Sequence, residues 1–287
     1  MGFLTLVQVT VWGCRGSLAT PGPETIRYGG NTSCLEVELP SGSVLVFDAG
    51  TGIRQLGAKL AGRNVRRIQL LLTHLHLDHV EGLRFFAPMW DEGVEVDIWG
   101  PPSPVASLRE RVARAFSPPL FPVELADVPA RVNFIDVPRE EWTLEDATLR
   151  ANQVLHPGPT VGYRIETGGM SLAYLPDHEP ALTSAFSERS RDWISGASLA
   201  GDADLLIHDA QFSEEEYVER VGWGHSSFAD AIAYGKAVGV ARLLLFHHDP
   251  GHDDAWLDET GRRAALLGCT DGVATTIARE GMVLPLS

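Results

Sequence analysis

The sequence predicts an α+β fold in which two β-sheets pack face to face between outer layers of helices. Two observations predict it. Apolar runs of strand length fall into two groups, one in each half of the chain, and segments with helical patterns flank each group. Because a sheet must bury its apolar face against another layer, these groups indicate a sandwich of two sheets inside helices. With 287 residues, 44% of them hydrophobic, we expect a single domain over residues 1–287.

The first half of the chain begins with a series of strands. Apolar or alternating runs predict them over residues 4–12, 33–39, 44–48 and 68–72. A short helix over 53–60 follows the turn at 50–52. The next segment, 81–132, is rich in proline and aromatic residues around one amphipathic helix over 103–115. We expect this segment to be a covering element near the functional site.

The second half repeats this pattern. Strands are expected over residues 132–137, 143–155, 160–167, 170–175, 203–208 and 242–246. Helices are expected between them at about 181–194, 226–238 and 254–267. Ser226 or Ser227 would be the N-cap of the second of these helices, because a hydroxyl oxygen can accept a hydrogen bond from the first helical turn.

A cluster of metal-ligand residues follows the apolar run 68–72. The chain reads His74-Leu75-His76-Leu77-Asp78-His79, and imidazoles and carboxylates are ligands that zinc and similar divalent ions prefer. A loop that turns sharply after a strand can aim two of these side chains one way and two another, which suits two adjacent metals. An ordinary solvated loop is the less favoured alternative, because clustered imidazoles repel one another on protonation unless a metal holds them.

Further histidines and one aspartate also stand at the ends of apolar runs. They are His156, Asp177, His208, His247 and His248. Strands of this kind are buried, so several of them can deliver ligands to one rim. His247 directly follows its run, and His248 beside it is the main rival as a ligand. The roles of His178, His208, His248 and His252 stay open, with hydrogen-bonded support or a solvated loop favoured for His208 and His252.

The motif His74-x-His76-x-Asp78-His79, followed in order by His156, Asp177 and His247, resembles the metallo-β-lactamase superfamily. The resemblance covers nearly the whole chain and implies a four-layer αββα sandwich with one or two metals at the sheet edges. By that likeness one metal is held by His74, His76 and His156, and the other by Asp78, His79 and His247. Asp177 would bridge the two metals.

Within the superfamily the chain is more similar to the tRNase Z and small phosphodiesterase branch. Three segments carry this likeness: residues 156–165 with a Gly-Tyr-Arg strand after the histidine, residues 206–212, and residues 224–227. In this branch the second and third segments supply an acid and a histidine near the leaving group, which would be Asp209 and His225 here. Residues 12–17 and 28–34 resemble a bacterial subgroup of hydrolases that includes proteins assigned as cyclic nucleotide phosphodiesterases.

The composition of the chain indicates which binding partners and which cellular compartment to expect. A net charge of -15 disfavours broad contact with nucleic acid or anionic membranes. Three cysteines without a CxxC pair indicate no disulfide framework and fit cytoplasmic residence. No stretch approaches the apolar length of a membrane span. The family likeness implies a homodimer, and nitrogen and oxygen ligands imply two divalent ions, with zinc preferred and manganese or iron as alternatives.

We therefore expect a dinuclear metal-dependent hydrolase that cleaves a small phosphodiester, with cyclic nucleotides as the first candidates. Hydroxide bridging the two ions would attack, Asp78 would orient it, and His225, held by Asp209, would protonate the leaving oxygen. One alternative at the same site is hydrolysis of a lactone, ester or thioester. Another is tRNA 3′ processing, which the lack of a basic inserted arm between 177 and 209 disfavours. A noncatalytic module would have broken ligand motifs, and none is broken.

Overall fold

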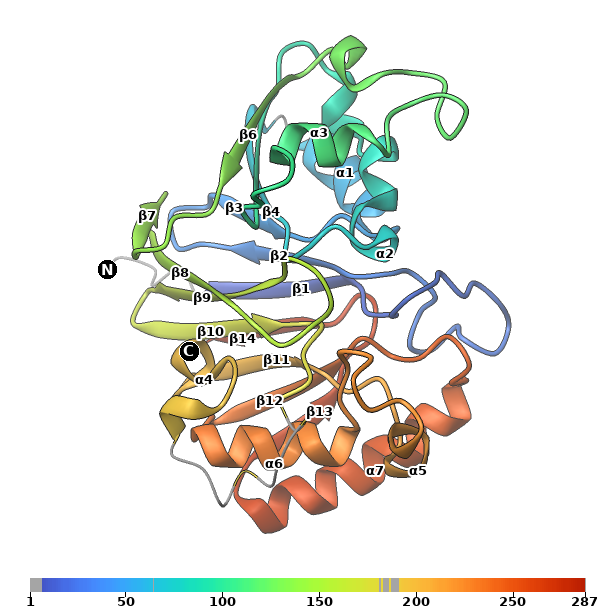
Figure 1. The fold of residues 1–287 in the computed structure, drawn as a ribbon, viewed down its shortest axis with the longest axis vertical. Helices are drawn as coiled ribbons and strands as arrows, with labels where there is room; N and C mark the ends of the chain where they lie inside the picture. The colour runs from blue at the N-terminus through green and yellow to red at the C-terminus, as the bar shows by residue number, and fades with distance from the viewer. Residues whose placement is uncertain (1–6, 64, 181, 183–185, 187–190, 287) are drawn as a thin grey trace.

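The protein has the expected α+β architecture of four layers. The computed structural model describes residues 7–63, 65–180, 182, 186 and 191–286. Two seven-stranded sheets face each other, and helices cover their outer faces (Figure 1). Buried side chains from both inner faces, among them Val9, Phe47 and Tyr174, form one core between the sheets. The predicted sandwich is therefore confirmed. No helix in the described residues is long and apolar enough to cross a membrane.

The first sheet has the strand order β14-β1-β2-β3-β4-β5-β6. Its strands are β1 (Val7–Gly13), β2 (Cys34–Glu38), β3 (Val44–Phe47), β4 (Arg67–Leu71), β5 (Glu95–Gly100), β6 (Arg131–Asp136) and β14 (Val283–Leu286). β14, β1, β2 and β3 pair antiparallel, whereas β3 to β6 run parallel. All four residues of β3 are buried, as expected for a strand covered by a sheet on one face and helices on the other.

The second sheet has the order β13-β12-β11-β10-β9-β8-β7. Its strands are β7 (Trp142–Leu144), β8 (Ala147–Gln153), β9 (Val161–Thr167), β10 (Met170–Leu175), β11 (Leu205–Asp209), β12 (Arg242–Phe246) and β13 (Ala274–Ile277). β7 to β10 pair antiparallel, and β10 to β13 run parallel. Each sheet therefore has a parallel half whose strands end at one edge.

Helices form the two outer layers (Figure 1). They are α1 (Ile53–Gly62), α2 (Leu77–Val80), α3 (Leu108–Ala113), α4 (Ala197–Ala200), α5 (Glu214–Val218), α6 (Phe228–Val238) and α7 (Asp254–Asp271), with 3-10 turns at Glu81–Phe85, Ala87–Trp90, Leu125–Asp127 and Arg191–Trp193. α1 and α3 lie on the side of the first sheet, and α6 and α7 on the side of the second. Ser227 is the N-cap of α6, because its hydroxyl accepts a hydrogen bond from the Asp230 amide at 3.0 Å.

Five expectations from the sequence need comment. The segment 81–132 is not only a covering element, because it contains β5, which pairs with β4 and β6 inside the first sheet. The strand expected over 143–155 is the hairpin β7–β8, since the chain turns at Glu145, where φ is 55°. The helix expected over 103–115 is shortened to α3. The helix expected over 181–194 falls largely outside the described residues, as does the start of the strand expected over 4–12.

Candidate metal centre

The predicted ligands come together at one edge of the sandwich, where strands of both sheets end. The first sheet contributes four of them through the loop after β4 and through α2, and the second sheet contributes three after β8, β10 and β12. The seven residues are His74, His76, Asp78, His79, His156, Asp177 and His247. They converge because the carboxyl ends of parallel strands meet at one edge of a sheet.

The turn from loop to helix at α2 separates the first four ligands into two pairs. The backbone is extended at His76 and becomes helical at Leu77. Asp78 and His79 are consequently buried, whereas Leu77 is 61% exposed. The sharp turn expected from the sequence is therefore present.

One candidate ligand group consists of His74, His76, His156 and Asp177, whose ligand atoms lie within 4.8 Å of one another. The Nε2 atoms of His74 and His156 are 3.6 and 3.7 Å from Asp177 Oδ2. His156 Nε2 is 3.1 Å from His76 Nδ1. Three imidazoles and a carboxylate around one point match the ligand types of a zinc site.

A second candidate group consists of Asp78, His79 and His247. His247 Nε2 lies 3.2 Å from Asp78 Oδ2 and 3.4 Å from His79 Nε2. Asp177 also reaches this group, with Oδ1 3.0 Å from His79 Nε2 and Oδ2 3.4 Å from His247 Nε2. The carboxylate of Asp177 therefore stands between the two groups, where it can contact an ion in each.

The hydrogen bonding of these residues fits bound metal. His74 Nε2 is buried and makes no hydrogen bond with any described residue. Asp177 Oδ1 is also buried and, although close to His79, makes no hydrogen bond of acceptable geometry there. Buried polar atoms without partners cost free energy unless a ligand satisfies them. Both unsatisfied atoms belong to candidate metal ligands.

The charge of the carboxylates at the centre also favours a bound cation. Burial lowers the pKa of His74 well below its ordinary value, and the neighbouring His79 lowers it further. Burial also acts to lower the pKa of His79, but the surrounding carboxylates, Asp177 first among them, outweigh it and hold this pKa well above its ordinary value. Burial acts to raise the pKa of Asp177, but the neighbouring imidazoles hold it well below its usual range. The centre thus contains charged carboxylates that can bind a divalent ion.

Asp48 contacts His79 of the second group on the side away from the other ligands and was not identified as a site residue from the sequence. It follows β3, is fully buried, and its Oδ2 lies 2.9 Å from His79 Nδ1. The same carboxylate accepts hydrogen bonds from the amide and hydroxyl of Thr73 and from the hydroxyl of Tyr174. An acid on the far nitrogen of a ligand histidine fixes its tautomer and its ring orientation. The available signal was a carboxylate directly after an apolar run.

His225 and Asp209 form the acid–histidine pair expected from the family resemblance. His225 Nδ1 is 2.6 Å from Asp209 Oδ2, and Asp209 Oδ1 accepts from the amides of Gln211 and Ser226. Burial acts to lower the pKa of His225, but Asp209 outweighs it and the pKa is raised to about 9. His225 can also form a ligand group with Asp177 and His247. It is therefore close enough to the centre either to donate a proton or to bind metal.

A second buried acid positions the loop that carries His225. Glu179, 2% exposed, accepts hydrogen bonds from the amides of Gly222 and Gly224 and from the hydroxyl of Tyr217. The carbonyl of Gly224 lies 2.8 Å from His156 Nδ1 and so orients this ligand. Sequence reasoning missed Glu179, although it stands two residues after Asp177.

The remaining histidines lie outside the ligand groups. His248 points to the carbonyl of Ala278 at 2.9 Å, so its neighbour His247 is the residue that reaches the centre. His208 and His178 bond to each other at 2.9 Å beneath the site. His252 Nε2 contacts the carboxylate of Glu216. The supporting roles favoured for His208 and His252 agree with these contacts.

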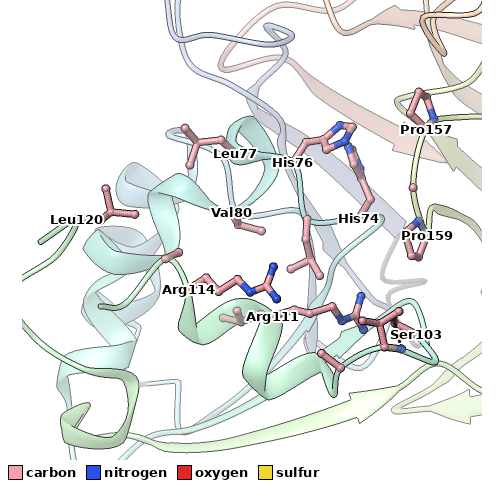
Figure 2. Close-up of a pocket in the computed structure, with 16 residues that line it drawn as sticks. His74, His76, Leu77, Val80, Ser103, Arg111, Arg114, Leu120, Pro157 and Pro159 are labelled. Carbon is pink, nitrogen blue, oxygen red and sulfur yellow. Dashed lines mark hydrogen bonds between the residues drawn. The ribbon is translucent and has the colours of Figure 1, made fainter. Parts of the chain in front are cut away.

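Two hollows flank the centre. The larger, about 520 Å³, is lined by sixteen residues from the segments 74–80, 103–120 and 157–159, and we call it the α3 cavity (Figure 2). The smaller, about 410 Å³, opens beside His225 and is lined by Phe212, Arg220 and Trp223 among others. Both volumes lie within the range of small-molecule sites. The centre is thus accessible from two sides.

A four-layer sandwich with histidine and aspartate groups at its strand ends is the arrangement of the metal-dependent hydrolases of the metallo-β-lactamase fold. The model of the family "Beta-lactamase superfamily domain" matches residues 44–248, and the chain belongs to this superfamily. The chain is 26% identical over 283 residues to a Ribonuclease Z of Mycobacterium sp. (strain KMS), with 88% of each protein covered.

Solved structures show the same fold. The metallo-beta-lactamase fold protein YhfI from Bacillus subtilis superposes with a TM-score of 0.69 at 19% identity, covering 98% of this chain and 100% of that one. A diphosphatase from the PhnP family superposes with a TM-score of 0.69 at 17% identity, covering 98% of each chain. These similarities bear on the fold and not on the substrate.

Proposed function

We propose that this chain is a two-metal phosphodiesterase acting on small phosphodiesters, with cyclic nucleotides as the first candidates. The observation that carries the proposal is the 2.6 Å contact between His225 and Asp209 beside the ligand groups. Hydrolysis of a phosphodiester expels an alkoxide that needs a proton, and a histidine held by a carboxylate can supply it. Hydrolysis of an ester or lactone at the same ligands also expels an alkoxide, so the substrate assay below, and not this pair, distinguishes the two reactions.

The ligand sets proposed for the metals follow the two groups. His74, His76 and His156 would hold one ion, Asp78, His79 and His247 the other, and Asp177 would contact both. When bound, two divalent ions would supply an activated water and neutralise charge on the phosphoryl oxygens. Zinc is the preferred identity, with manganese or iron as alternatives, because histidine and carboxylate ligands accept all three.

The chain's own residues would handle the protons and the orientation of the reacting groups. Asp209 accepts a hydrogen bond from His225 Nδ1–H, which leaves Nε2–H to donate its proton to the leaving oxygen. The raised pKa of His225, about 9, keeps this proton in place at neutral pH. Asp78 is held by the amide of Ser17 at 2.7 Å, and its carboxylate would orient the attacking water.

A parallel substrate assay tests the proposal. The metal content of the purified protein is measured first, and this form is then assayed with bis-p-nitrophenyl phosphate, a cyclic nucleotide and an acyl lactone. We expect turnover of one or both phosphodiesters and little of the lactone. Turnover of the lactone alone would overturn the proposal in favour of ester hydrolysis.

A homodimer in solution and cytoplasmic residence are secondary proposals, and light scattering checks the first.

The similarity to Ribonuclease Z favours one second candidate, tRNA 3′ processing. The net charge of -15 is the observation against it, since binding to tRNA requires cationic contacts with its phosphates. Incubation of the purified protein with a precursor tRNA separates the two candidates. Cleavage at the discriminator base with ordinary turnover would favour the second.

A further inference from the structure

The α3 cavity is the feature of this centre that the proposed chemistry leaves unused. His74 and His76 form part of its wall, so it opens directly onto the first ligand group. Figure 2 shows these histidines on one side of the cavity and the side chains of Arg111 and Arg114 on the α3 side. A group attached to a phosphate at the metals can therefore extend toward the two arginines.

Most of the cavity wall is apolar. Leu75 and Val80 line it next to the ligand loop, Val112 lines it on α3, and Pro157 and Pro159 line the opposite rim. Leu77 and Leu120, which also line the cavity, are 61% and 72% exposed. Large apolar side chains exposed around a hollow favour an apolar occupant, because binding removes their surface from water.

The charge of the cavity is opposite to that of the whole protein. Among the described residues no carboxylate lines it, although the chain carries 38 acidic residues and only 23 basic ones. Neither Arg111 nor Arg114 forms an ion pair with a carboxylate in the described part of the chain. Arg111 donates to the carbonyl of Pro101, but its Nε is buried and has no partner among those residues. Asp136 is close enough to act on the charge of Arg111 but forms no salt bridge with it. A partly buried guanidinium without a carboxylate in direct contact favours an anionic ligand.

We propose that the α3 cavity binds an apolar group of the substrate that ends in a second negative charge, which Arg111 and Arg114 recognise. This inference rests on the proposed function and narrows it to small phosphodiesters with a second negative charge, which simple cyclic nucleotides lack. The preferred phosphodiesters would carry, on the alcohol that is not expelled, an alkyl or aryl arm with a terminal anion. The apolar wall would bind the alkyl or aryl arm, and the guanidinium groups would bind its terminal anion.

Three phosphodiesters with the same p-nitrophenol leaving group test the inference. Their second alcohols are methanol, hexanol and 6-hydroxyhexanoate, so that the arm and the terminal carboxylate are added one at a time. We expect kcat/KM to rise from the methyl to the hexyl diester and again, by about tenfold, to the carboxylate-bearing diester. Equal kcat/KM for the hexyl and carboxylate-bearing diesters would overturn the assignment of the arginines.

Variants assign the two effects to the cavity. Arg111→Gln and Arg114→Gln should each remove most of the advantage of the carboxylate-bearing diester over the hexyl diester. Ala106→Phe places a ring in the cavity from a loop residue. It should remove the advantage in kcat/KM that the hexyl and carboxylate-bearing diesters have over the methyl diester. Arg109→Gln is the matched control, because Arg109 lies on the same helix but does not line the cavity. An equal effect of Arg109→Gln and Arg114→Gln would contradict the inference.

A binding experiment separates the failure of this inference from that of the proposed function. The probe is 1-naphthalenesulfonate, an apolar anion without an ester bond, titrated into the purified protein by calorimetry. We expect binding that Arg111→Gln, Arg114→Gln and Ala106→Phe weaken and Arg109→Gln does not. If no phosphodiester is cleaved but this pattern appears, the proposed function fails and the cavity assignment stands. If the probe does not bind, or binds all variants alike, the assignment is wrong.

Discussion

Asp48 is a single residue on which the geometry of the second ligand group depends. Its carboxylate joins His79 to Thr73 and Tyr174, and it is fully buried. Its φ of 57° lies in the left-handed region, which aspartate and asparagine tolerate better than most residues. Position 48 thus combines an uncommon backbone conformation with a buried charge.

We expect Asp48→Asn to keep the fold and to weaken metal binding by about 10- to 100-fold, because an amide holds the His79 imidazole less well than a carboxylate. Competition with a chromophoric chelator measures the affinity. Asp97→Asn is the matched control, since Asp97 is also buried but bonds to Arg67 and Gln69 away from the centre. Equal losses in the two variants would show that the effect is general destabilisation.

The role proposed for His225 makes a separate prediction. His225→Gln should lower kcat by about 10²- to 10⁴-fold for an alkyl leaving group, because the expelled alkoxide then lacks a proton donor. For p-nitrophenolate, which leaves without a proton, the loss should be much smaller. Metal content measured on the same samples should be unchanged. Loss of one ion in the variant would instead make His225 a metal ligand.

Residues of the ligand motif could be predicted from the sequence because each stands in a short segment after a recognisable strand. Asp48 and Glu179 occupy similar positions, but their partners come from other strands and loops. Which carboxylate lies behind which imidazole depends on the packing of β3 beside β4, and a single strand pattern does not contain that information. His247 could be ranked above His248 because it directly follows the apolar run, which is where the superfamily's ligand falls.

At the level of elements, most strands could be predicted from the sequence, whereas β5, β13 and β14 were missed. β12 is apolar except for Arg242, and β4 is buried from Ile68 to Leu71, so their runs stand out. β5 contains Glu95 and Asp97, and Asp97 is buried because Arg67, Gln69 and Asn133 on the adjacent strands bond to it. These partners become visible only after the strands have been paired, and so β5 was read as part of a covering segment.

The loop before α6 offers a prediction at this scale. Glu179→Gln should lower the free energy of unfolding by about 1–3 kcal/mol, because the buried carboxylate accepts two backbone amides and a hydroxyl. Denaturant unfolding measures the loss. The control is Glu166→Gln: Glu166 is 41% exposed and pairs with Arg150 and Arg164, so its loss should be about 1 kcal/mol or less. A Glu179→Gln loss no larger than this would contradict the assigned role.

For the molecule as a whole, both sheets supply ligands to each candidate group, so bound metal would link the two halves of the sandwich. Removal of metal with a chelator should lower the melting temperature. If the free metal concentration before chelation is a thousandfold above Kd, the free energy of unfolding should fall by about 4 kcal/mol. Asp177→Asn is the comparison variant, because Asp177 contacts both ligand groups. The chelator should lower the melting temperature of this variant by less than that of the original protein. An identical shift in the two proteins would place the metal elsewhere.

The metal-free protein should also lose stability in mild acid. Burial lowers the pKa of His208 to about 4 and that of His248 to about 3, below the unfolded value of about 6.5. Because the unfolded chain binds these protons first, stability is present above about pH 6.5 and falls by up to about 1.4 kcal/mol per pH unit per histidine toward pH 4. Denaturant unfolding at several pH values measures this dependence. The free energy of unfolding should change less steeply with pH in His208→Gln than in the original protein. An unchanged slope would remove His208 as a cause.

The pairing of β14 with β1 has a consequence for the order in which the chain can fold. Val7 pairs with Leu286, so one edge of β1 stays open until nearly all of the described chain has been synthesised. Contacts between such distant residues form slowly, because a long loop has to close first. Until then the open edge can pair with the same strand of another nascent copy. Once β14 has paired, it replaces β1 as the edge strand of the sheet. Its Pro285 lacks an amide hydrogen, which makes this edge a poorer template for pairing than β1.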